Sequence, residues 1–126
     1  MLDADFFKNI NDKHGHVTGD EALRHIAKVV KACISKEDIF ARYGGEEFII
    51  AVTNCNVADV KGIAERIRNQ IEQTPMHYNN IDVQLTVSIG VSRIGRAGII
   101  EDIETADKML YRAKEEGRNK AVFEFG

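Results

Sequence analysis

The sequence predicts an α+β domain in which helices cover a mainly antiparallel sheet. Three observations predict this fold class. Apolar residues recur every three or four positions in three separate stretches, two strand-like runs flank a glycine-containing turn, and one longer stretch alternates between apolar and polar residues. The length fits one domain, and the chain has no internal repeat, linker or low-complexity segment. We therefore expect residues 1–126 to form a single domain.

The three apolar stripes predict three helices. The first covers about 20–34. The second follows Asn56, a suitable N-cap, and ends at Thr74-Pro75, because the residue before a proline disfavours helical geometry. The third covers about 101–116 and ends before Gly117, a residue suited to the left-handed position that follows a helix.

Five further stretches are typical of strands. They are residues 1–5, 39–43, 48–53, 82–92 and 122–125. The turn Gly44-Gly45-Glu46-Glu47 joins the second and third stretches as a hairpin. The fourth stretch alternates throughout and is expected to be one long, half-buried strand, whereas residues 6–19 are expected to form a loop.

Composition excludes several classes of function. The net charge is −3, and the sequence has neither a basic tail nor a Lys/Arg stripe, which argues against nucleic acid as the main partner. No apolar run approaches the roughly 20 residues of a membrane span, and acidic residues at the start argue against a secretory signal. Cys33 and Cys55 lack metal-type spacing and are expected to be reduced. We therefore expect a cytoplasmic location and no direct membrane contact from this segment.

Four carboxylates are the first candidates for chemistry. Asp3 and Asp5 end the first strand, and Glu46 and Glu47 lie in the hairpin turn. If these places meet, two charges about 5 Å apart repel by roughly 3 kcal/mol at an effective dielectric constant of about 20, so the cluster needs a cation. Oxygen ligands favour Mg²⁺ or Mn²⁺, with water and substrate phosphates completing the coordination. The alternative is a solvated acidic turn, and the preceding glycine pair fits both interpretations.

Four motifs, in a fixed order, carry a family resemblance. They are D-x-D-x-F-K-x-I-N-D-x-x-G-H-x-x-G-D (3–20), R-Y-G-G-E-E-F (42–48), S-I-G-V (88–91) and A-D-x-x-L-Y-x-A-K-x-x-G-R-N (106–119). Together they span nearly the whole chain, and they resemble the GGDEF domain of diguanylate cyclases. The resemblance implies a ferredoxin-like fold similar to nucleotidyl cyclases and polymerase palm domains. It also implies a family domain that begins upstream with a helix and the first half of strand one, which residues 1–126 are expected to lack.

The resemblance implies a set of metal-binding and catalytic residues. Asp3 and Glu46 resemble the two Mg²⁺-binding carboxylates, and the backbone carbonyl of Ala4 resembles the third ligand. Glu46 also resembles the base for the ribose 3′-hydroxyl, although a metal alone can lower the pKa of that hydroxyl. Lys8 resembles the lysine that neutralises charge on the transferred phosphoryl group. The family accepts Asp or Glu at position 46, so the resemblance implies that this G-G-E-E-F variant is an active form.

Another set resembles the residues that recognise the guanine base. Asn11 and Asp20 resemble the guanine readers, because a carboxylate beside an amide matches the hydrogen-bonding edge of guanine and not that of adenine. Both are also good cap or turn residues, and Asp20 is expected to cap the helix that follows it. His16 resembles a histidine that contacts substrate, with a structural histidine as the alternative. Gly45 is expected to lie against the substrate, since it leaves room beside the backbone.

Cations and backbone amides resemble the triphosphate contacts. The amides of Phe6 and Phe7 resemble donors to phosphate oxygens, and Lys114 and Arg118 resemble the pair that reaches the triphosphate tail. The alternative for that pair is helix capping, because a helix C-terminus favours basic residues in any case.

The implied reaction joins two GTP molecules into cyclic di-3′,5′-GMP with loss of two pyrophosphates. Each domain would hold one GTP, so a two-fold product requires a second copy of the domain in an antiparallel homodimer. Two other hypotheses remain: a non-catalytic regulatory module that binds GTP or cyclic di-GMP, and a ferredoxin-like interaction domain without a ligand.

One part of the family pattern is degenerate in this sequence. Many cyclases carry an inhibitory product site, R-x-x-D, shortly before the glycine pair. Here Asp38 is present, but Ser35 replaces the arginine, and serine cannot make the bidentate contacts of a guanidinium. We therefore expect little product feedback through this site.

Overall fold

The computed structural model describes residues 1–95 and 97–125. Its strands are β1 (Leu2–Ala4), β2 (Ile39–Gly44), β3 (Glu47–Ala51), β4 (Met76–Tyr78), β5 (Ile81–Val83), β6 (Val87–Ser92) and β7 (Ala121–Glu124). Its helices are α1 (Phe7–His14), α2 (His16–Cys33), α3 (Val57–Gln73) and α4 (Ile99–Glu115).

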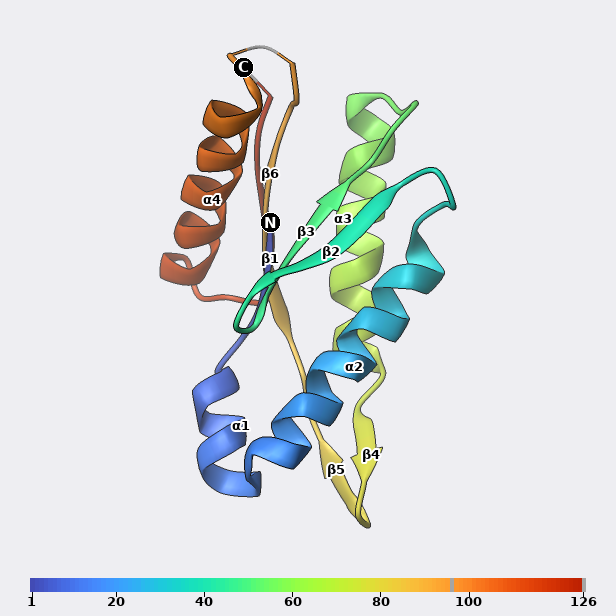
Figure 1. The fold of residues 1–126 in the computed structure, drawn as a ribbon, viewed down its shortest axis with the longest axis vertical. Helices are drawn as coiled ribbons and strands as arrows, with labels where there is room; N and C mark the ends of the chain where they lie inside the picture. The colour runs from blue at the N-terminus through green and yellow to red at the C-terminus, as the bar shows by residue number, and fades with distance from the viewer. Residues whose placement is uncertain (96, 126) are drawn as a thin grey trace.

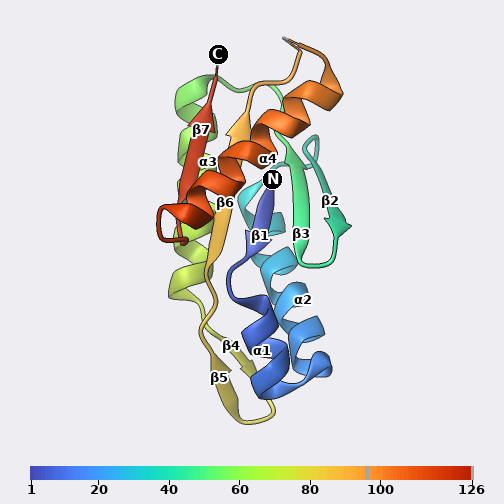
Figure 2. The same ribbon diagram turned by 90° about the vertical axis from the view of Figure 1, so that its left-hand side faces the viewer.

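A five-stranded sheet in the order β2-β3-β1-β6-β7 runs through the molecule, and β4 and β5 form a separate hairpin (Figure 1). Neighbours in the large sheet are antiparallel except β6 and β7, which are parallel because α4 carries the chain back between them. α2 and α3 cover one face of the sheet, and α4 covers the other (Figures 1 and 2). The predicted α+β class is confirmed.

β1 occupies the middle of this sheet. Leu2 pairs with Phe48 of β3 on one side and with Ile89 of β6 on the other. Because side chains alternate along a strand, Leu2 and Ala4 enter the main core, whereas the carboxylate of Asp3 lies on the α4 side and meets a lysine of that helix. The same short strand therefore contributes to the core and to a polar site.

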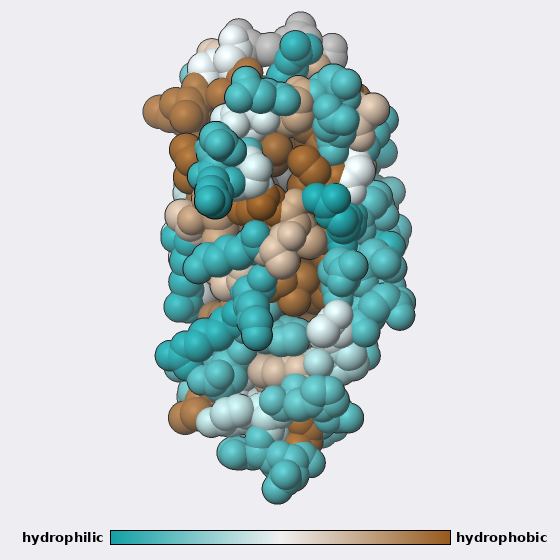
Figure 3. Space-filling model, turned by 90° about the vertical axis from the view of Figure 1, so that its right-hand side faces the viewer, coloured by the Kyte–Doolittle hydropathy of each residue, from teal (hydrophilic) through white to brown (hydrophobic). Residues whose placement is uncertain are grey.

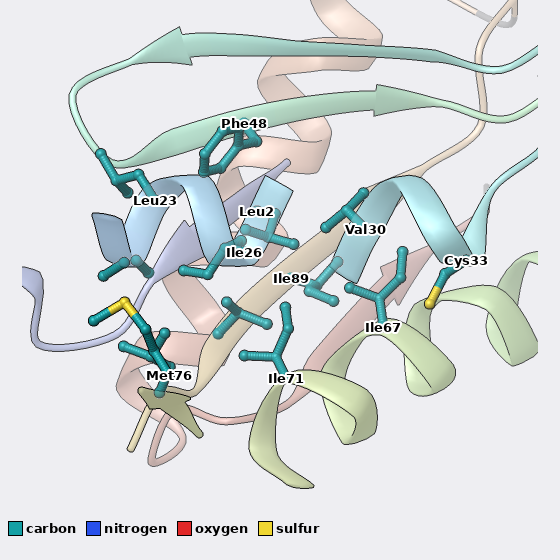
Figure 4. Close-up of a cluster of buried hydrophobic side chains, with 14 of the residues drawn as sticks. Leu2, Leu23, Ile26, Val30, Cys33, Phe48, Ile67, Ile71, Met76 and Ile89 are labelled. Atoms are coloured by element: carbon teal, nitrogen blue, oxygen red, sulfur yellow. The ribbon is translucent and has the colours of Figure 1, made fainter. Parts of the chain in front are cut away.

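The main core lies between the sheet and the helices α2 and α3 (Figure 4). Ile26 and Val30 of α2 and Ile71 of α3 are fully buried, and they pack in one cluster with Leu2. Each such side chain contributes roughly 1.5–3 kcal/mol of favourable burial. The helical stripes predicted these buried positions.

α4 packs closely on β6 at Gly90. A Cβ at this position would lie 2.1 Å from the Ala106 carbonyl oxygen and 2.1 Å from the Leu110 amide nitrogen. Only glycine fits there without moving the helix. The close approach of α4 brings the C-terminal end of this helix beside β1.

Several predicted boundaries are confirmed. The glycine turn joins β2 to β3 as a hairpin. Asn56 caps α3 in a capping box with Asp59, whose amide donates to Asn56 Oδ1 over 2.8 Å. Gly117 follows α4 with φ of 115°, as expected of the residue after a helix.

The predicted loop over residues 6–19 is wrong, because α1 and the first residues of α2 occupy it. α1 has a single buried residue, Ile10, so it presents no repeating apolar stripe to detect. α2 begins at His16 with Gly15 as its N-cap. Asp20 therefore lies inside α2 and does not cap it, contrary to expectation.

The predicted single strand over 82–92 is also wrong. The chain forms β5, leaves the sheet pattern at residues 84–86, and then forms β6. β5 pairs with β4, a strand that the sequence did not predict, through a turn in which Asn79 and Asn80 have φ of 49° and 61°. The apolar alternation continues across the break because Val83 and Leu85 are both buried, although β5 and β6 have different partners.

From the side of α2 and α3, hydrophobic residues gather in a strip down the middle with hydrophilic residues on both sides (Figure 3). Among residues 1–95 and 97–125, none of the helices has the length and apolar character to cross a bilayer. Cys33 and Cys55 are both free cysteines, the first buried and the second partly buried, and the reduced state stays a prediction.

Candidate active site

Three segments that are distant in sequence meet at one end of β1. They are the β2–β3 turn, the end of β1 with the start of α1, and the C-terminal end of α4 with the loop that follows it. Figure 2 shows β1 leading into α1 beside the end of α4. Direct contacts join the segments: the Ala4 amide donates to the Glu46 carbonyl over 3.3 Å, and Lys114 contacts Asp3.

The β2–β3 turn holds Glu46 beside β1. Gly44 pairs with Glu47, so Gly45 and Glu46 form the tip of a tight turn. Gly45 has φ of 51°, a left-handed conformation that glycine adopts without strain, and its carbonyl accepts a hydrogen bond from Arg42 Nε over 2.8 Å. A Cβ on Gly45 would meet nothing within 4 Å, so open space lies beside this backbone, as the substrate-contact prediction requires.

Asp3 is the most perturbed carboxylate of the site. Its side chain is 4% exposed and accepts a hydrogen bond and ion pair from Lys114 Nζ over 2.6 Å. Burial raises the pKa of Asp3 from 3.8 to about 6, Lys114 opposes this increase, and the charges of Glu46 and Glu47 add to it. Three carboxylates are therefore close enough to act on one another, and a cation already compensates one of them.

This donor set fits a hard divalent cation. All the available donors are oxygens, and the Lys114 ammonium already stands as a cation against the Asp3 carboxylate. Within the described ranges, no three His, Cys, Asp or Glu side chains form a preformed metal cage. An ion with only two protein carboxylates as ligands would need water and substrate oxygens, which is the usual arrangement for Mg²⁺.

Asp5 has a different environment from Asp3. It is 5% exposed and accepts hydrogen bonds from Thr86 Oγ1 over 2.8 Å, Ser88 Oγ over 2.7 Å and the Asn119 amide over 3.0 Å. These donors engage both of its carboxylate oxygens. Asp5 thus connects β1, β6 and the loop after α4, and it is not available as a metal ligand.

The N-terminus of α1 offers donors for an anion. Phe6 precedes the helix with φ of 55°, and the first intrahelical bond runs from the Ile10 amide to the Phe6 carbonyl. The earlier amides, including those of Phe6 and Phe7, have no partner within α1, and the first turn contains no acidic residue. Lys8 lies exposed in this turn. The Arg118 guanidinium lies 4.6 Å from the centre of the Phe6 ring, which adds a second positive charge to this end.

The predicted guanine readers lie on the α1–α2 pair. Asn11 Oδ1 is buried and has no hydrogen-bond partner among the described residues. Gly19 packs against it, because a Cβ there would lie 1.8 Å from that oxygen. His16 and Asp20 are exposed on the first turns of α2. An unsatisfied buried amide oxygen is costly in a folded protein, so it is a reasonable place for a ligand to donate a hydrogen bond.

The sequence comparison decides the family. Residues 1–120 match the family model described as the GGDEF domain of diguanylate cyclase. The chain belongs to the GGDEF family.

This GGDEF domain has relatives with the expected name. It is 43% identical over 124 residues to diguanylate cyclase A of Treponema denticola and 40% identical over 127 residues to the probable diguanylate cyclase DgcF of Escherichia coli K12. The matches cover 97% and 95% of this chain but 33% and 40% of those proteins. The chain therefore spans only about a third to two-fifths of the relatives' length.

Solved structures confirm the expected fold of the family. The GGDEF domain of DgcB from Caulobacter crescentus, in complex with c-di-GMP, has a TM-score of 0.90 and 34% identity, covering 97% of this chain and 74% of that one. The active GGEEF domain of a diguanylate cyclase from Vibrio cholerae has a TM-score of 0.86 and 37% identity, covering 97% and 78%.

The degenerate product-site window of this GGDEF domain has a structural role. Asp38 accepts hydrogen bonds from the Ser35 amide over 2.9 Å and the Thr53 amide over 3.0 Å, and these bonds lower its pKa. Asp38 thus ties the start of β2 to the end of β3. The expectation of weak product feedback stays a prediction.

Sequence reasoning missed the structural role of two residues that organise this GGDEF domain, since it placed Asp5 only in the candidate cation cluster and gave Asn119 no role. Asp5 and Asn119 both lie inside the quoted motifs, in D-x-D and G-R-N. Their partners are 47 to 114 positions away in the chain. Their place inside the motifs could have indicated that these two residues matter, but it could not have identified their hydrogen-bond partners.

Proposed function

We propose that this domain is one half of a diguanylate cyclase, which joins two GTP molecules into cyclic di-3′,5′-GMP and releases two pyrophosphates. The observation that carries the proposal is the buried Asp3 carboxylate, beside Glu46 and the N-terminus of α1, with the Lys114 ammonium against it. One place thus combines carboxylates for a metal, free amides for phosphates and cations for the triphosphate. The Vibrio cholerae relative is described as an active GGEEF domain, which supports glutamate at position 46.

The triphosphate would lie over the start of α1. Amides of Phe6 and Phe7 would donate to phosphate oxygens, and Lys8 would neutralise charge that develops on the transferred group. Arg118 already lies over Phe6 at this end, and Lys114 stands within reach of Asp3. This arrangement positions the phosphates and stabilises charge, which is most of what phosphoryl transfer requires of a protein.

Asp3, Glu46 and the carbonyl of Ala4 would hold a divalent cation, which we propose to be Mg²⁺ or Mn²⁺. Such an ion, when bound, neutralises phosphate charge and lowers the pKa of a nearby hydroxyl. Glu46 is the residue that we propose as the proton acceptor for the ribose 3′-hydroxyl.

Guanine would lie between α1 and α2. The Asn11 amide and the Asp20 carboxylate would read its hydrogen-bonding edge, with His16 and the Gly45 backbone as further contacts. Adenine presents a donor and an acceptor in the opposite places, so it would leave these groups unpaired.

Each bond-forming step consumes one hydroxyl and releases one pyrophosphate. The 3′-oxygen of one GTP forms a bond to the α-phosphorus of the other, the bond from that phosphorus to the β-phosphate bridging oxygen breaks, and the 3′-hydroxyl proton goes to the base. A second, symmetric step closes the ring. Two copies of the domain, each with one GTP, would face one another across a two-fold axis. GTP as substrate and two reduced cysteines favour the cytoplasm as the location.

The direct test is incubation with GTP and Mg²⁺ at high protein concentration, followed by assays for pyrophosphate and cyclic di-GMP. We expect both products from the wild type and none from Glu46→Gln, which keeps the size of the side chain and removes its charge. GTP binding without turnover, even when two copies are tethered, would contradict the enzyme and favour a regulatory binding module.

A further inference from the structure

The loop after α4 has an unusual backbone. Gly117, Arg118 and Asn119 have φ of 115°, 65° and 48°, so two consecutive non-glycine residues are left-handed. This conformation costs a non-glycine residue on the order of 1 kcal/mol, somewhat less for asparagine. Such a conformation persists only when surrounding contacts hold it.

Asn119 makes those contacts on three sides. Its backbone amide donates to Asp5 Oδ2 over 3.0 Å, its Nδ2 donates to Glu72 Oε2, and its Oδ1 accepts from Arg68 NH1 over 3.1 Å. Arg68 also binds Glu72 over 3.3 Å, so the two α3 residues form a closed set with Asn119. We call these three side chains the Asn119 clamp.

Asn119 connects rigid parts of the molecule, through its backbone amide to Asp5 and through the clamp to α3. Asp5 is buried and bound to Thr86 and Ser88 as well as to Asn119. α3 is anchored in the main core through residues such as Ile71, one position before Glu72. The loop after α4 is therefore fixed both to the strand that carries Asp3 and to a packed helix.

Arg118 is fixed as a result. Its amide donates to the Ala113 carbonyl over 2.9 Å, which binds it to the end of α4, and the clamp holds the next residue together with the Asp5 bond. Its side chain then crosses to the start of α1, where the guanidinium lies 4.6 Å from the centre of the Phe6 ring. Phe6 is itself left-handed and 57% exposed, so an aromatic surface is held out at this place.

We propose that Asn119 is a positioning residue, which acts through Arg118 to set the triphosphate affinity of the site. Asn119 touches no reacting atom; its clamp fixes the Arg118 backbone so that the guanidinium meets the β- and γ-phosphates above α1. The inference rests on the proposed function. A flexible arginine would lose conformational entropy on binding, and the clamp removes that cost in advance.

The first experiment compares GTP with GMP by calorimetry. GMP keeps the guanine and the α-phosphate but lacks the β- and γ-phosphates. We expect Asn119→Ala and Asn119→Gly to weaken GTP binding about tenfold, the magnitude of one well-placed charge-assisted contact, and to leave GMP binding unchanged. Glycine accepts the left-handed φ, so its loss of affinity reports the side-chain clamp alone. Asn80→Ala, at a left-handed asparagine of the β4–β5 turn, is the matched control and should bind GTP normally.

The second experiment is a double-mutant cycle with Arg118→Ala. If Asn119 acts through Arg118, Asn119→Ala should add almost nothing to the loss of GTP affinity in the Arg118→Ala background. Additive effects, or normal GTP affinity of Asn119→Gly, would overturn the inference. Failure of the wild type to bind either nucleotide would instead overturn the proposed function, and the inference with it.

A third measurement needs no nucleotide. The Phe6 ring should shift the NMR signals of the Arg118 side chain upfield, and Phe6→Leu identifies that shift by removing it. We expect the shift to disappear in Asn119→Ala and to persist in Asn80→Ala. A shift retained in Asn119→Ala would show that the guanidinium is positioned without the clamp.

Discussion

At the scale of single residues, Asp3 shows a conflict between stability and chemistry. Its carboxylate is nearly excluded from water, with Glu46 and Glu47 close by and one lysine in compensation. Burial without full pairing destabilises the charged form, which is why its pKa rises to about 6. The charged carboxylate of Asp3 is therefore unfavourable for folding but well suited to binding a cation.

Replacing Asp3 should therefore stabilise the ion-free protein. The folded pKa of about 6 lies above the reference value of 3.8, so the folded state favours protonated Asp3. The charged carboxylate therefore lowers the stability of the fold fully above about pH 6 and not at all below pH 3.8. We expect Asp3→Asn to melt a few degrees higher than the wild type at about pH 8, and at the same temperature at about pH 4. Thermal unfolding across pH in a chelating buffer measures this.

The same variant should lose turnover with GTP. An Asp3→Asn protein that melts lower than the wild type at alkaline pH would show that the Lys114 ion pair outweighs the cost of burial.

Residue roles were accessible from the sequence only where a motif carried them. Asp3, Glu46 and Lys114 were named in advance, and the structure brings them together. The structural roles of Asp5 and Asn119 were missed, because these roles lie in hydrogen bonds to strands and helices far away in the chain. Spacing along a chain does not contain that information.

At the scale of elements, the periodicity of apolar residues predicted the long helices that bury a single face. α3 and α4 were found nearly to their ends, because each repeats its apolar face over many turns. α1 was missed because eight residues with one buried side chain give no period. The break between β5 and β6 was missed because alternation records which face is buried, and not which strand is the partner.

The packing of α1 on α2 gives a test at this scale. Gly19 lies inside α2, where alanine normally stabilises a helix by about 1 kcal/mol. Here a Cβ would lie 1.8 Å from Asn11 Oδ1, so Gly19→Ala must displace the predicted guanine reader. We expect weaker binding of GMP and GTP alike, which distinguishes this variant from those at Asn119.

Gly62→Ala in α3 is the control for Gly19→Ala, since its Cβ would meet nothing within 4 Å. It should raise the melting temperature slightly and leave nucleotide affinity unchanged. Normal GMP affinity of Gly19→Ala would argue against Asn11 as a base contact.

At the scale of the whole molecule, the candidate site is half of what the proposed reaction needs. Asp3, Glu46 and Arg118 would serve one nucleotide, whereas the proposed product contains two that are related by a two-fold axis. Control of such a reaction lies in whether two domains meet, because each alone holds its GTP without an acceptor.

The rate should therefore depend on protein concentration more steeply than in a one-domain enzyme. We expect the cyclic di-GMP formed per molecule of protein to fall on dilution, and to stay constant when two copies are joined by a flexible linker. Product measured at several dilutions, with and without the linker, checks this. A constant specific activity for the unlinked protein would indicate a stable dimer or a different mechanism.

The alternation along β1 has a consequence for how this sequence can change over generations. Leu2 and Ala4 belong to the core, while Asp3 belongs to the polar face. One inserted or deleted residue in this strand would turn the core-facing side chains to the polar face and place the Asp3 carboxylate in the hydrophobic core. Descendants of this sequence should therefore keep the length of β1 even where its side chains vary, and should gain or lose residues at exposed turns such as the one between β4 and β5.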